Sequence, residues 1–402
     1  MLNKMRVLAF SHFLQGPAGT QYLADMGADV IKVEPLQGVW ERHRHPAGQV
    51  PGVNATHLAL NRNKRSIAID LKHALAKDIL MPVMEACNVV VENYRVGVLD
   101  RLGFGYEDMK ARKPDIIYAS ATGWGSSGPM RDAPGQDLLV QARSGIVSAT
   151  GTDRPTPVGS PIMDQHGASL LAMGVLAAYV RLLETGVGTR VESNLFNAGI
   201  DLQMEAITVW HADQADQSRF ERSSNLATWF HEAPYGIYKL KDCHIAISNG
   251  PNIGKLPEAL GSEALKPYAG SDRLANREEI ARIVAEELKR WTWAELDAAF
   301  RPHGLWYQKV LADYGELDYD PQAAANEIFC EFPIGDRSVR LINHPIRYDG
   351  KTCAINRVPW KIGNDTHQVL AEAGFSGSDI QHFVNSGAVA APNADTEIET
   401  VS

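Results

Sequence analysis

The sequence predicts an α/β protein with a large domain built on a parallel sheet and a second, smaller α+β domain. In the first half of the chain, short aliphatic segments alternate with helical patterns, as in a parallel sheet covered by helices on both faces. The chain has 402 residues, more than one compact core usually accommodates. After about Trp210 a polar segment is followed by a mixture of short strands and helices, which indicates the second domain.

The elements of the large domain are predicted from runs of aliphatic residues and from turn signals such as Gly16-Pro17. The expected strands are 6–10, 30–33, 66–70, 88–91 and 116–120, and the expected helices are 18–26, 74–86 and 106–112. Residues 168–183 form the strongest helical pattern, apolar nearly all round and ended by Gly186 and Gly188. This composition predicts a buried helix.

The segment 213–230 is predicted to be a linker because it begins with polar residues rich in Gln, Ser and Arg. The smaller domain is expected over residues 231–332, with strands at 236–240 and 244–248 and helices at 277–290 and 293–300. A further helical stretch is expected over 358–388, and the tail after Pro392 is expected to be disordered.

The composition excludes several classes of partner and site. A net charge of -9 makes the chain a poor general binder of nucleic acid or anionic membranes, so neither is an expected partner. A polyanionic ligand would need a local basic cluster. The four cysteines are far apart and form no C-x-x-C pair, which argues against a zinc site and a disulfide framework.

No targeting or membrane segment is predicted. The apolar run after Lys4 and Arg6 is interrupted by His12 and lacks a signal-peptide cleavage pattern. The most apolar stretch, residues 170–180, is too short to span a bilayer. The cytoplasm is therefore the expected location.

Residues 123–128 match the G-x-G-x-x-G pattern of dinucleotide-binding proteins and follow an expected strand. In those proteins the pattern opens a helix directly, so that the helix N-terminus meets the pyrophosphate. Here Pro129 and Pro134 follow within a polar stretch. We therefore interpret the segment as a turn-rich loop.

Asp164 is the carboxylate that the sequence singles out, because it lies at the start of the strongest helix. The residue pattern by itself favours a helix N-cap. A nucleophile is also compatible with the position, since a helix N-terminus keeps a carboxylate ionised. His166 is expected to point away from Asp164, and Asp137 is expected to be a charge in the first turn of another helix.

A second group of polar residues follows the expected strands. Asn93, Arg95 and Arg101 come after the strand that ends near Glu92, and Lys72 comes after the strand 66–70. Open α/β sheets bind ligands in a crevice at the carboxyl ends of their strands. Cations at this edge can hold phosphate groups, although each cation singly is more often a solvated charge.

Several spaced motifs along the chain carry a family resemblance. They are Gly16-Pro17 and residues 23–35, 60–67, 91–95, 99–103, 121–123, 141–145, 185–188 and 191–196. In this order they resemble the class III CoA-transferase family, which includes formyl-CoA transferase and carnitine CoA-transferase. The resemblance covers nearly the whole chain. Val39 departs from it, since members often carry Asp there, and residues 249–254 match the family's glycine loop only in part.

The resemblance implies a catalytic role for Asp164 as the nucleophile that moves CoA between an acyl-CoA donor and a small carboxylic acid. It implies an aspartyl anhydride and an aspartyl-CoA thioester as intermediates, with no metal and no permanently bound cofactor. The residues that it places near CoA are Gln15, Ile69, Asp70, Leu71, Lys72, Asn93, Tyr94, Arg95 and Arg101.

The resemblance also implies a Rossmann-like large domain over residues 1–212, completed by residues 333–402, and a homodimer of two interlocked rings. Two alternatives stay open. One is a 2-methylacyl-CoA racemase of the same superfamily, and the other is a CoA-binding protein without catalysis. The related racemases carry a histidine where this chain has Gln136, and a neutral amide cannot act as the second acid-base group.

Overall fold

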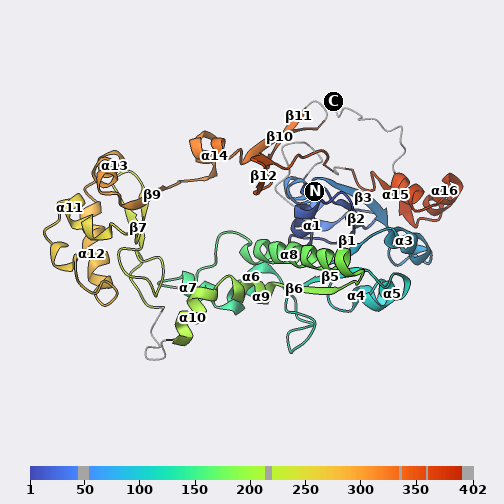
Figure 1. The fold of residues 1–402 in the computed structure, drawn as a ribbon, viewed down its shortest axis with the longest axis horizontal. Coiled ribbons are helices and arrows are strands. Elements are labelled where there is room, and N and C mark those ends of the chain that lie inside the picture. The colour runs from blue at the N-terminus through green and yellow to red at the C-terminus, as the bar shows by residue number, and fades with distance from the viewer. Residues whose placement is uncertain (44–53, 213–219, 335–336, 359–360, 392–402) are drawn as a thin grey trace. The chain divides into compact units, whose positions relative to one another are not determined.

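The computed structural model describes residues 1–43, 54–212, 220–334, 337–358 and 361–391 (Figure 1). Contacts divide the chain into two compact units. The first comprises Met1–Val140, Pro161–Leu202 and Ala323–Ser402, and the second comprises Gln141–Ser160 and Gln203–Gln322. Part of the predicted linker, 213–219, and the predicted disordered tail lie outside the described residues.

The first unit contains a seven-stranded sheet in the order β14-β3-β2-β1-β4-β5-β6. Its strands are β1 Arg6–Phe10, β2 Asp29–Glu34, β3 Lys64–Ile69, β4 Val89–Glu92, β5 Ile117–Thr122, β6 Arg190–Asn194 and β14 Val389–Ala390. All neighbours are parallel except β14, which runs antiparallel to β3. The predicted α/β class and mainly parallel sheet are confirmed. The order 3-2-1-4-5-6 is that of a doubly wound Rossmann-type sheet, which reverses between β1 and β4.

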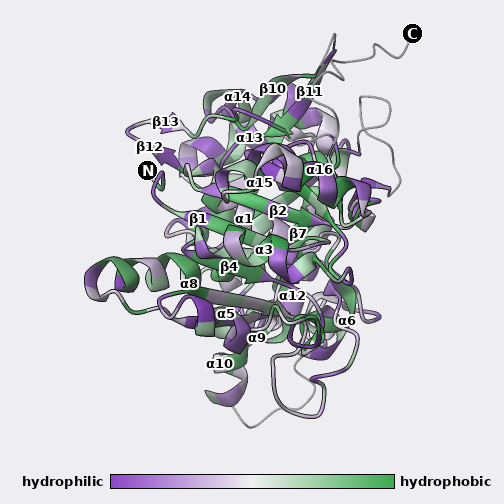
Figure 2. Ribbon diagram, turned by 90° about the vertical axis from the view of Figure 1, so that its right-hand side faces the viewer, coloured by the Kyte–Doolittle hydropathy of each residue, from purple (hydrophilic) through white to green (hydrophobic). Residues whose placement is uncertain are grey.

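Helices cover both faces of this sheet. The first unit contains α1 Gln15–Asp25, α2 Ala55–Asn61, α3 Ala76–Glu85, α4 Val98–Leu102, α5 Tyr106–Arg112, α8 Ile162–Thr185, α9 Leu195–Asp201, α15 Thr366–Glu372 and α16 Gly377–Asn385. One apolar core joins the sheet to α1 and α8, and the other joins it to α3, α5, α15 and α16. The central strands are drawn largely in the hydrophobic colour in Figure 2. Burial on both faces explains their continuous aliphatic runs.

The helix α8 differs from its prediction in length and in burial. It has 24 residues and begins six residues before the expected start, so that Asp164 lies inside its first turn. The predicted full burial is wrong: Met173, Val180 and Leu183 are 61%, 53% and 66% exposed, because only one side of the helix packs on α1 and the sheet. Residues 170–180 were also predicted to be too short to span a bilayer. The helix that contains them is longer, and by length and composition alone α8 could cross a membrane. A core helix passes the same test.

The C-terminal part of the chain differs from its prediction because its helical stretch is divided into two helices. The expected helical stretch 358–388 contains two short helices, α15 and α16, and the strand β14 follows them. Gly374, at a φ of 95°, ends the first helix, and a capping box between Ser376 and Asp379 starts the second. Two small hairpins precede these helices, β10 Phe329–Ile334 with β11 Arg337–Ile342 and β12 Arg347–Tyr348 with β13 Lys351–Thr352.

The second unit has its own sheet and its own core. Three antiparallel strands, β7 Gly236–Lys239, β8 His244–Ser248 and β9 Trp306–Val310, pack with helices in one apolar cluster. The helices of this unit are α7 Ile146–Thr150, α10 Met204–Ala212, α11 Leu256–Leu260, α12 Arg277–Leu288 and α13 Trp293–Phe300. The helices α6 Asp137–Ser144 and α14 Pro321–Ala325 each begin in one unit and end in the other. Residues 141–160, expected in the large domain, belong here by contacts. Arg222 explains this placement, because it donates to the carbonyl groups at the end of α7.

Candidate active site

A cavity of about 630 Å³ lies in the first unit, where the strand order of the sheet reverses. Its lining includes the loop after β1, the loop after β4 and the start of α8. Of the predicted site residues, Gln15, Asn93, Tyr94, Arg95 and Asp164 line this cavity. Segments far apart in the sequence therefore meet at the crevice in which doubly wound sheets bind ligands.

Asn93 fastens the loop between β1 and α1. Its amide nitrogen donates to the carbonyl oxygen of His12 at 2.7 Å, and its Oδ1 accepts from the His12 backbone N–H at 2.9 Å. Gly16, next to Gln15 in the sequence, packs closely against Ser11 and Asn93. A Cβ at Gly16 would lie 2.9 Å from the Ser11 Cβ and 3.0 Å from the Asn93 Cγ. Only glycine fits this close approach. Asn93 thus holds the loop that carries Gln15.

The N-terminus of α8 is capped by a residue from another helix. One carboxylate oxygen of Asp137, in the first turn of α6, accepts from the backbone N–H groups of Met163 at 2.7 Å and Asp164 at 3.1 Å. The residue in the N-cap position of α8, Pro161, offers no side-chain hydrogen bond. The interpretation of Asp164 as an N-cap is therefore wrong. Its carboxylate faces the cavity instead of closing the helix.

The Asp164 carboxyl group titrates near neutral pH. Burial and the neighbouring Asp137 carboxylate raise its pKa from 3.8 to about 7, while a hydrogen bond from the Gln15 backbone N–H lowers it. The expectation that the helix N-terminus keeps this group fully ionised is corrected, because the loss of hydration and the like charge oppose the helix dipole. Roughly half of the Asp164 side chains are ionised at pH 7.

Gln15 contributes two donors near the first turns of α8. Its backbone N–H donates to the Asp164 carboxyl group, and its side chain lies against α8 at Gly167, where a Cβ would come within 2.8 Å of the Gln15 Nε2. Within the described residues this Nε2 is buried and has no hydrogen-bond partner. A buried donor without a partner is costly unless a ligand binds it.

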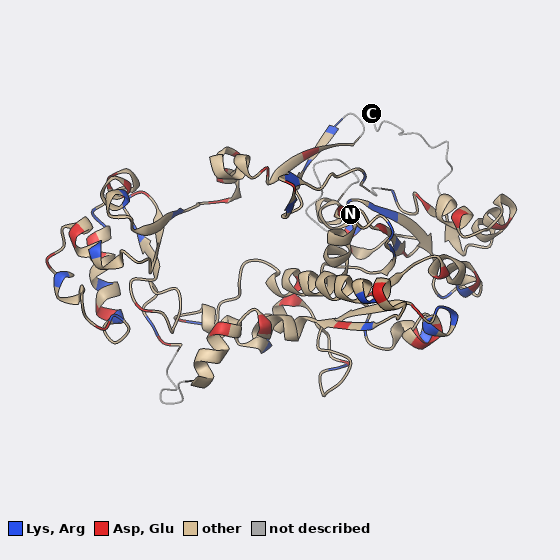
Figure 3. Ribbon diagram, viewed as in Figure 1, with Lys and Arg blue, Asp and Glu red and all other residues tan. Residues whose placement is uncertain are grey.

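The other predicted CoA residues lie outside this cavity. Ile69 is buried in β3, so only its backbone can meet a ligand. Asp70, Leu71 and Lys72 follow it, and Arg101 is exposed on α4. Three inter-strand spacings separate β3 from β4, roughly 14 Å, so Lys72 and Arg101 belong to separate parts of the sheet edge. Among the described residues, cations are interspersed with acidic groups rather than gathered in one stripe (Figure 3).

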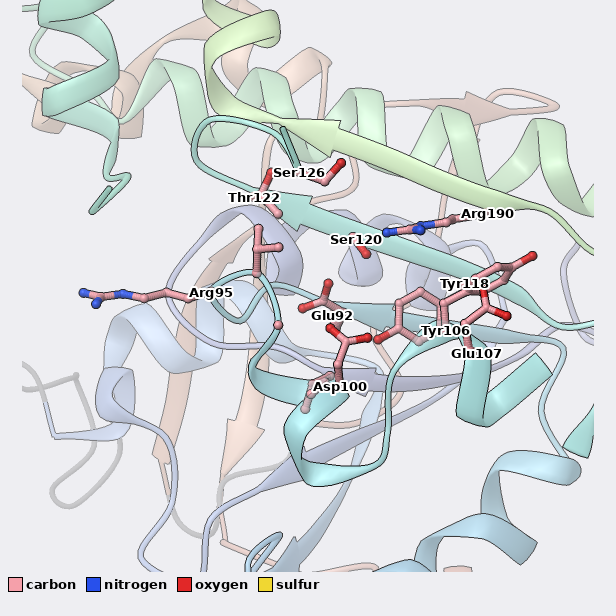
Figure 4. Close-up of a pocket in the computed structure, with 13 residues that line it drawn as sticks. Glu92, Arg95, Asp100, Tyr106, Glu107, Tyr118, Ser120, Thr122, Ser126 and Arg190 are labelled. Carbon is pink, nitrogen blue, oxygen red and sulfur yellow. The ribbon is translucent and has the colours of Figure 1, made fainter. Parts of the chain in front are cut away.

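A smaller cavity of about 80 Å³ lies beside the first and shares Arg95, Val96 and Thr122 with it. Figure 4 shows the carboxyl groups of Glu92 and Asp100 inside it, while the Arg95 side chain points away. Burial raises the pKa of Glu92 to about 7, although bonds from Ser120 and the Tyr94 N–H oppose the shift. Glu92 accepts from the Tyr94 N–H at 2.9 Å and so supports the loop after β4.

The structure shows where two other residues near Asp164 lie. The His166 Nε2 lies 2.7 Å from a carboxylate oxygen of Asp201. This partner agrees with the expectation that His166 points away from Asp164. Gln136 lines the cavity beside Asp137.

The cap that Asp137 supplies to α8 was not predicted from the sequence, because its partner Asp164 lies 27 positions along the chain. The loop interpretation of residues 123–128 is confirmed, since α6 starts only at Asp137.

Comparisons with known proteins agree on one family. The sequence profile of CoA-transferase family III matches residues 2–366. The chain is 29% identical over 385 residues to the succinyl-CoA:glutarate CoA-transferase of Homo sapiens, across 92% of this chain and 85% of that protein. It is 32% identical over 305 residues to the succinyl-CoA:mesaconate CoA-transferase of Haloarcula hispanica, across 72% and 74%. A solved CAIB/BAIF family protein from Brucella suis superposes with a TM-score of 0.79 at 28% identity, across 92% and 99%.

Proposed function

The chain belongs to CoA-transferase family III, and from this membership we propose that it moves CoA from an acyl-CoA donor to a small carboxylic acid through Asp164. One observation carries the assignment of the nucleophile. The Asp164 carboxyl group lines the cavity of about 630 Å³ at the crevice of the sheet, with a pKa raised to about 7. A carboxylate that loses hydration but still ionises near neutral pH is well suited to attack a thioester.

The proposed reaction consists of four acyl transfers. The Asp164 carboxylate attacks the donor thioester carbonyl and expels CoA thiolate, which leaves a mixed anhydride. The thiolate attacks the aspartyl carbonyl carbon, so that the donor acid leaves and an aspartyl-CoA thioester remains. The acceptor carboxylate then attacks this thioester and releases the thiolate again. Finally the thiolate attacks the acceptor carbonyl, which yields the new acyl-CoA and restores the Asp164 carboxylate.

Each step passes through a tetrahedral intermediate with an oxyanion that needs hydrogen-bond donors. Gln15 supplies two candidates, its backbone N–H and its buried Nε2, for which the described residues hold no partner. The backbone N–H belongs to the first residue of α1, and the Nε2 belongs to a side chain that is buried against α8. We assign the oxyanion site to Gln15 because its backbone N–H already donates to the Asp164 carboxyl group and its Nε2 lies against the same helix, at Gly167.

The remaining expectations follow as parts of the same proposal. We assign the path of CoA to the backbone of Ile69, to Asp70–Lys72 and to Asn93–Arg95 with Arg101, at the carboxyl edge of the sheet. We also propose a cytoplasmic homodimer, whose second copy covers the exposed apolar face of α8. Two interlocked chains would bury that face. The relatives act on succinyl-CoA by name, so succinyl-CoA is the first donor to test.

The test uses the purified full-length chain with succinyl-, acetyl- and formyl-CoA and a panel of dicarboxylates. Mass spectrometry should find new CoA thioesters, and hydroxylamine added with a donor should modify Asp164 as its hydroxamate. Asp164→Ala should remove both signals, whereas Asp201→Asn, at the carboxylate partner of His166, should retain them. Turnover by Asp164→Ala within tenfold of the wild type would remove Asp164 from the mechanism.

A parallel measurement separates the transferase from the racemase. Racemisation needs an acid-base group on each side of the α-carbon, and Gln136 cannot supply one. We therefore expect no exchange of the α-proton of 2-methylacyl-CoA in deuterated water. Fast deuteration without exchange of CoA between acids would favour the racemase. Failure of every acyl-CoA to react, despite measurable CoA binding, would favour a binding protein.

A further inference from the structure

We propose that the buried ion pair between Lys32 and Glu41 is a positioning pair, which holds the β1–α1 loop so that Gln15 presents its backbone N–H to Asp164. The inference extends the proposed function, since it concerns the group that we assign as the nucleophile. The pair lies on β2 and on the short helical turn Trp40–Arg42, outside the elements that carry Asp164.

The pair holds the loop at two points. The Lys32 Nζ donates to the Ser11 carbonyl oxygen at 2.7 Å and lies 3.3 Å from one carboxylate oxygen of Glu41. The other Glu41 oxygen accepts from the Phe13 backbone N–H at 3.2 Å. Both side chains are buried, with 0% and 1% of their surface exposed. Because Asn93 binds His12 between these points, three consecutive residues of the loop are fixed by long-range hydrogen bonds.

The loop needs such support because its backbone is strained. Phe13 has a φ of 60°, in the left-handed region that a bulky residue rarely adopts. A residue stays there only when its surroundings over-determine its conformation. A buried ion pair contributes little net stability, because the lost hydration offsets the attraction, but its fixed geometry can select one conformation.

The loop leads directly to the reacting group. Gln15 starts α1 two residues after Phe13, and its N–H donates to the Asp164 carboxyl group. Weakening this hydrogen bond would raise the pKa of Asp164 further, because the bond favours the ionised form. The titratable groups that line the same cavity are His12, Glu41, Tyr94, Arg95, Arg131 and Asp137. Burial lowers the pKa of His12 to about 4, so this ring is neutral above pH 5, and Asp137 is the anion that acts on Asp164.

The test measures the titration of Asp164 itself. A water-soluble carbodiimide with an added amine labels the protonated carboxyl group, and peptide mass spectrometry reads the labelled fraction between pH 5 and 9. The main variant, Lys32→Met with Glu41→Met, removes one positive and one negative charge, so the net charge is unchanged. The two residues should act as a unit, and we expect the Asp164 midpoint to rise by about half a pH unit or more.

Single variants separate positioning from direct charge effects. Removing the Glu41 anion would lower the Asp164 midpoint by direct Coulomb action, whereas losing the brace on Phe13 would raise it. Glu41→Met should therefore have a higher midpoint than Glu41→Gln, which loses the same charge but keeps an oxygen acceptor for the Phe13 N–H. If the double variant does not fold, this difference between Glu41→Met and Glu41→Gln decides the question.

Arg65→Met is the matched control. Arg65 is also a buried cation, paired with Asp29 at 2.6 Å and with Glu372 at 2.9 Å, but it lies at the amino-terminal edge of the sheet. The Arg65→Met variant should lower the thermal midpoint of unfolding without changing the midpoint of the Asp164 titration. An Asp164 midpoint that is the same in Glu41→Met as in Glu41→Gln, with the double variant at the wild-type value if it folds, would overturn the inference. The labelling does not depend on CoA transfer. An inactive wild type would therefore contradict the proposed function, but not the inference about the positioning pair.

Discussion

Replacing Asp137 with Asn tests how the cap of α8 controls the chemistry of Asp164. Asp137 has two effects on its neighbour: it accepts from the backbone N–H groups of Met163 and Asp164, and its charge raises the pKa of Asp164. Asparagine keeps a side-chain oxygen for the cap and is an equally good capping residue. Asp137→Asn therefore removes the charge and leaves the helix start in place.

The expected shift follows from the causes of the raised pKa. Burial is the largest cause and is unchanged in the variant, so the pKa of about 7 should fall only part of the way, by about one pH unit. At pH 6 the ionised fraction of Asp164 would rise from about 9% to about 50%, roughly fivefold. At pH 8 it would rise only from about 91% to about 99%. Because we propose the ionised form as the nucleophile, we expect the acid side of the rate profile to move to lower pH.

The assay is the single-turnover conversion of the acyl-CoA donor by an excess of enzyme, followed by mass spectrometry between pH 5.5 and 9 in wild type, Asp137→Asn and Asp201→Asn. Asp201 is the control because its carboxylate is bound to His166 on the neighbouring turn of α8. The acid limb should move about one pH unit down in Asp137→Asn and stay in place in Asp201→Asn. An unchanged or upward-shifted limb in Asp137→Asn, with its folding intact, would refute the account of the Asp164 pKa.

Three further predictions concern the same region. Gly167→Ala should leave the thermal midpoint unchanged or raised, since alanine favours a helix interior by about 1 kcal/mol. It should lower acylation at least tenfold, because the new Cβ lies 2.8 Å from the Gln15 Nε2. Asp164→Asn should stabilise the fold at pH 8 by on the order of 2 kcal/mol, and not at pH 4. The folded pKa is raised, so the contribution of the Asp164 carboxyl group to stability is fully present below pH 4 and is lost as the pH rises through about 7. Urea melts at both pH values check this. Arg101→Ala should weaken CoA binding roughly tenfold or more by calorimetry, and an unchanged Kd would remove Arg101 from the CoA path.

Local pattern was enough for many elements of the fold, but not for all of them. The strands β1 and β8 and the helices α5 and α13 have the same bounds in the structure as in the prediction. Period-two and period-3.6 patterns and turn residues act within a few positions, so they can be read from the chain. The strands β6 and β14 were missed. Both are edge strands, and β14 has only two residues, so neither carries a strong aliphatic run.

The chemistry of the site depended on contacts that no local pattern contains. The sequence identified Asp164 as the important carboxylate, and the motifs that resemble a known family pointed to its role. The cap from Asp137, the brace from Lys32 and Glu41, and the clamp from Asn93 join residues 9 to 81 positions apart. The pKa of Asp164 follows from its burial and from the carboxylate that the fold places beside it. Burial and long-range contacts exist only after the chain has folded. The sequence therefore determined which carboxyl group we propose as the nucleophile, and the tertiary structure decided its pKa and the donors that lie near it.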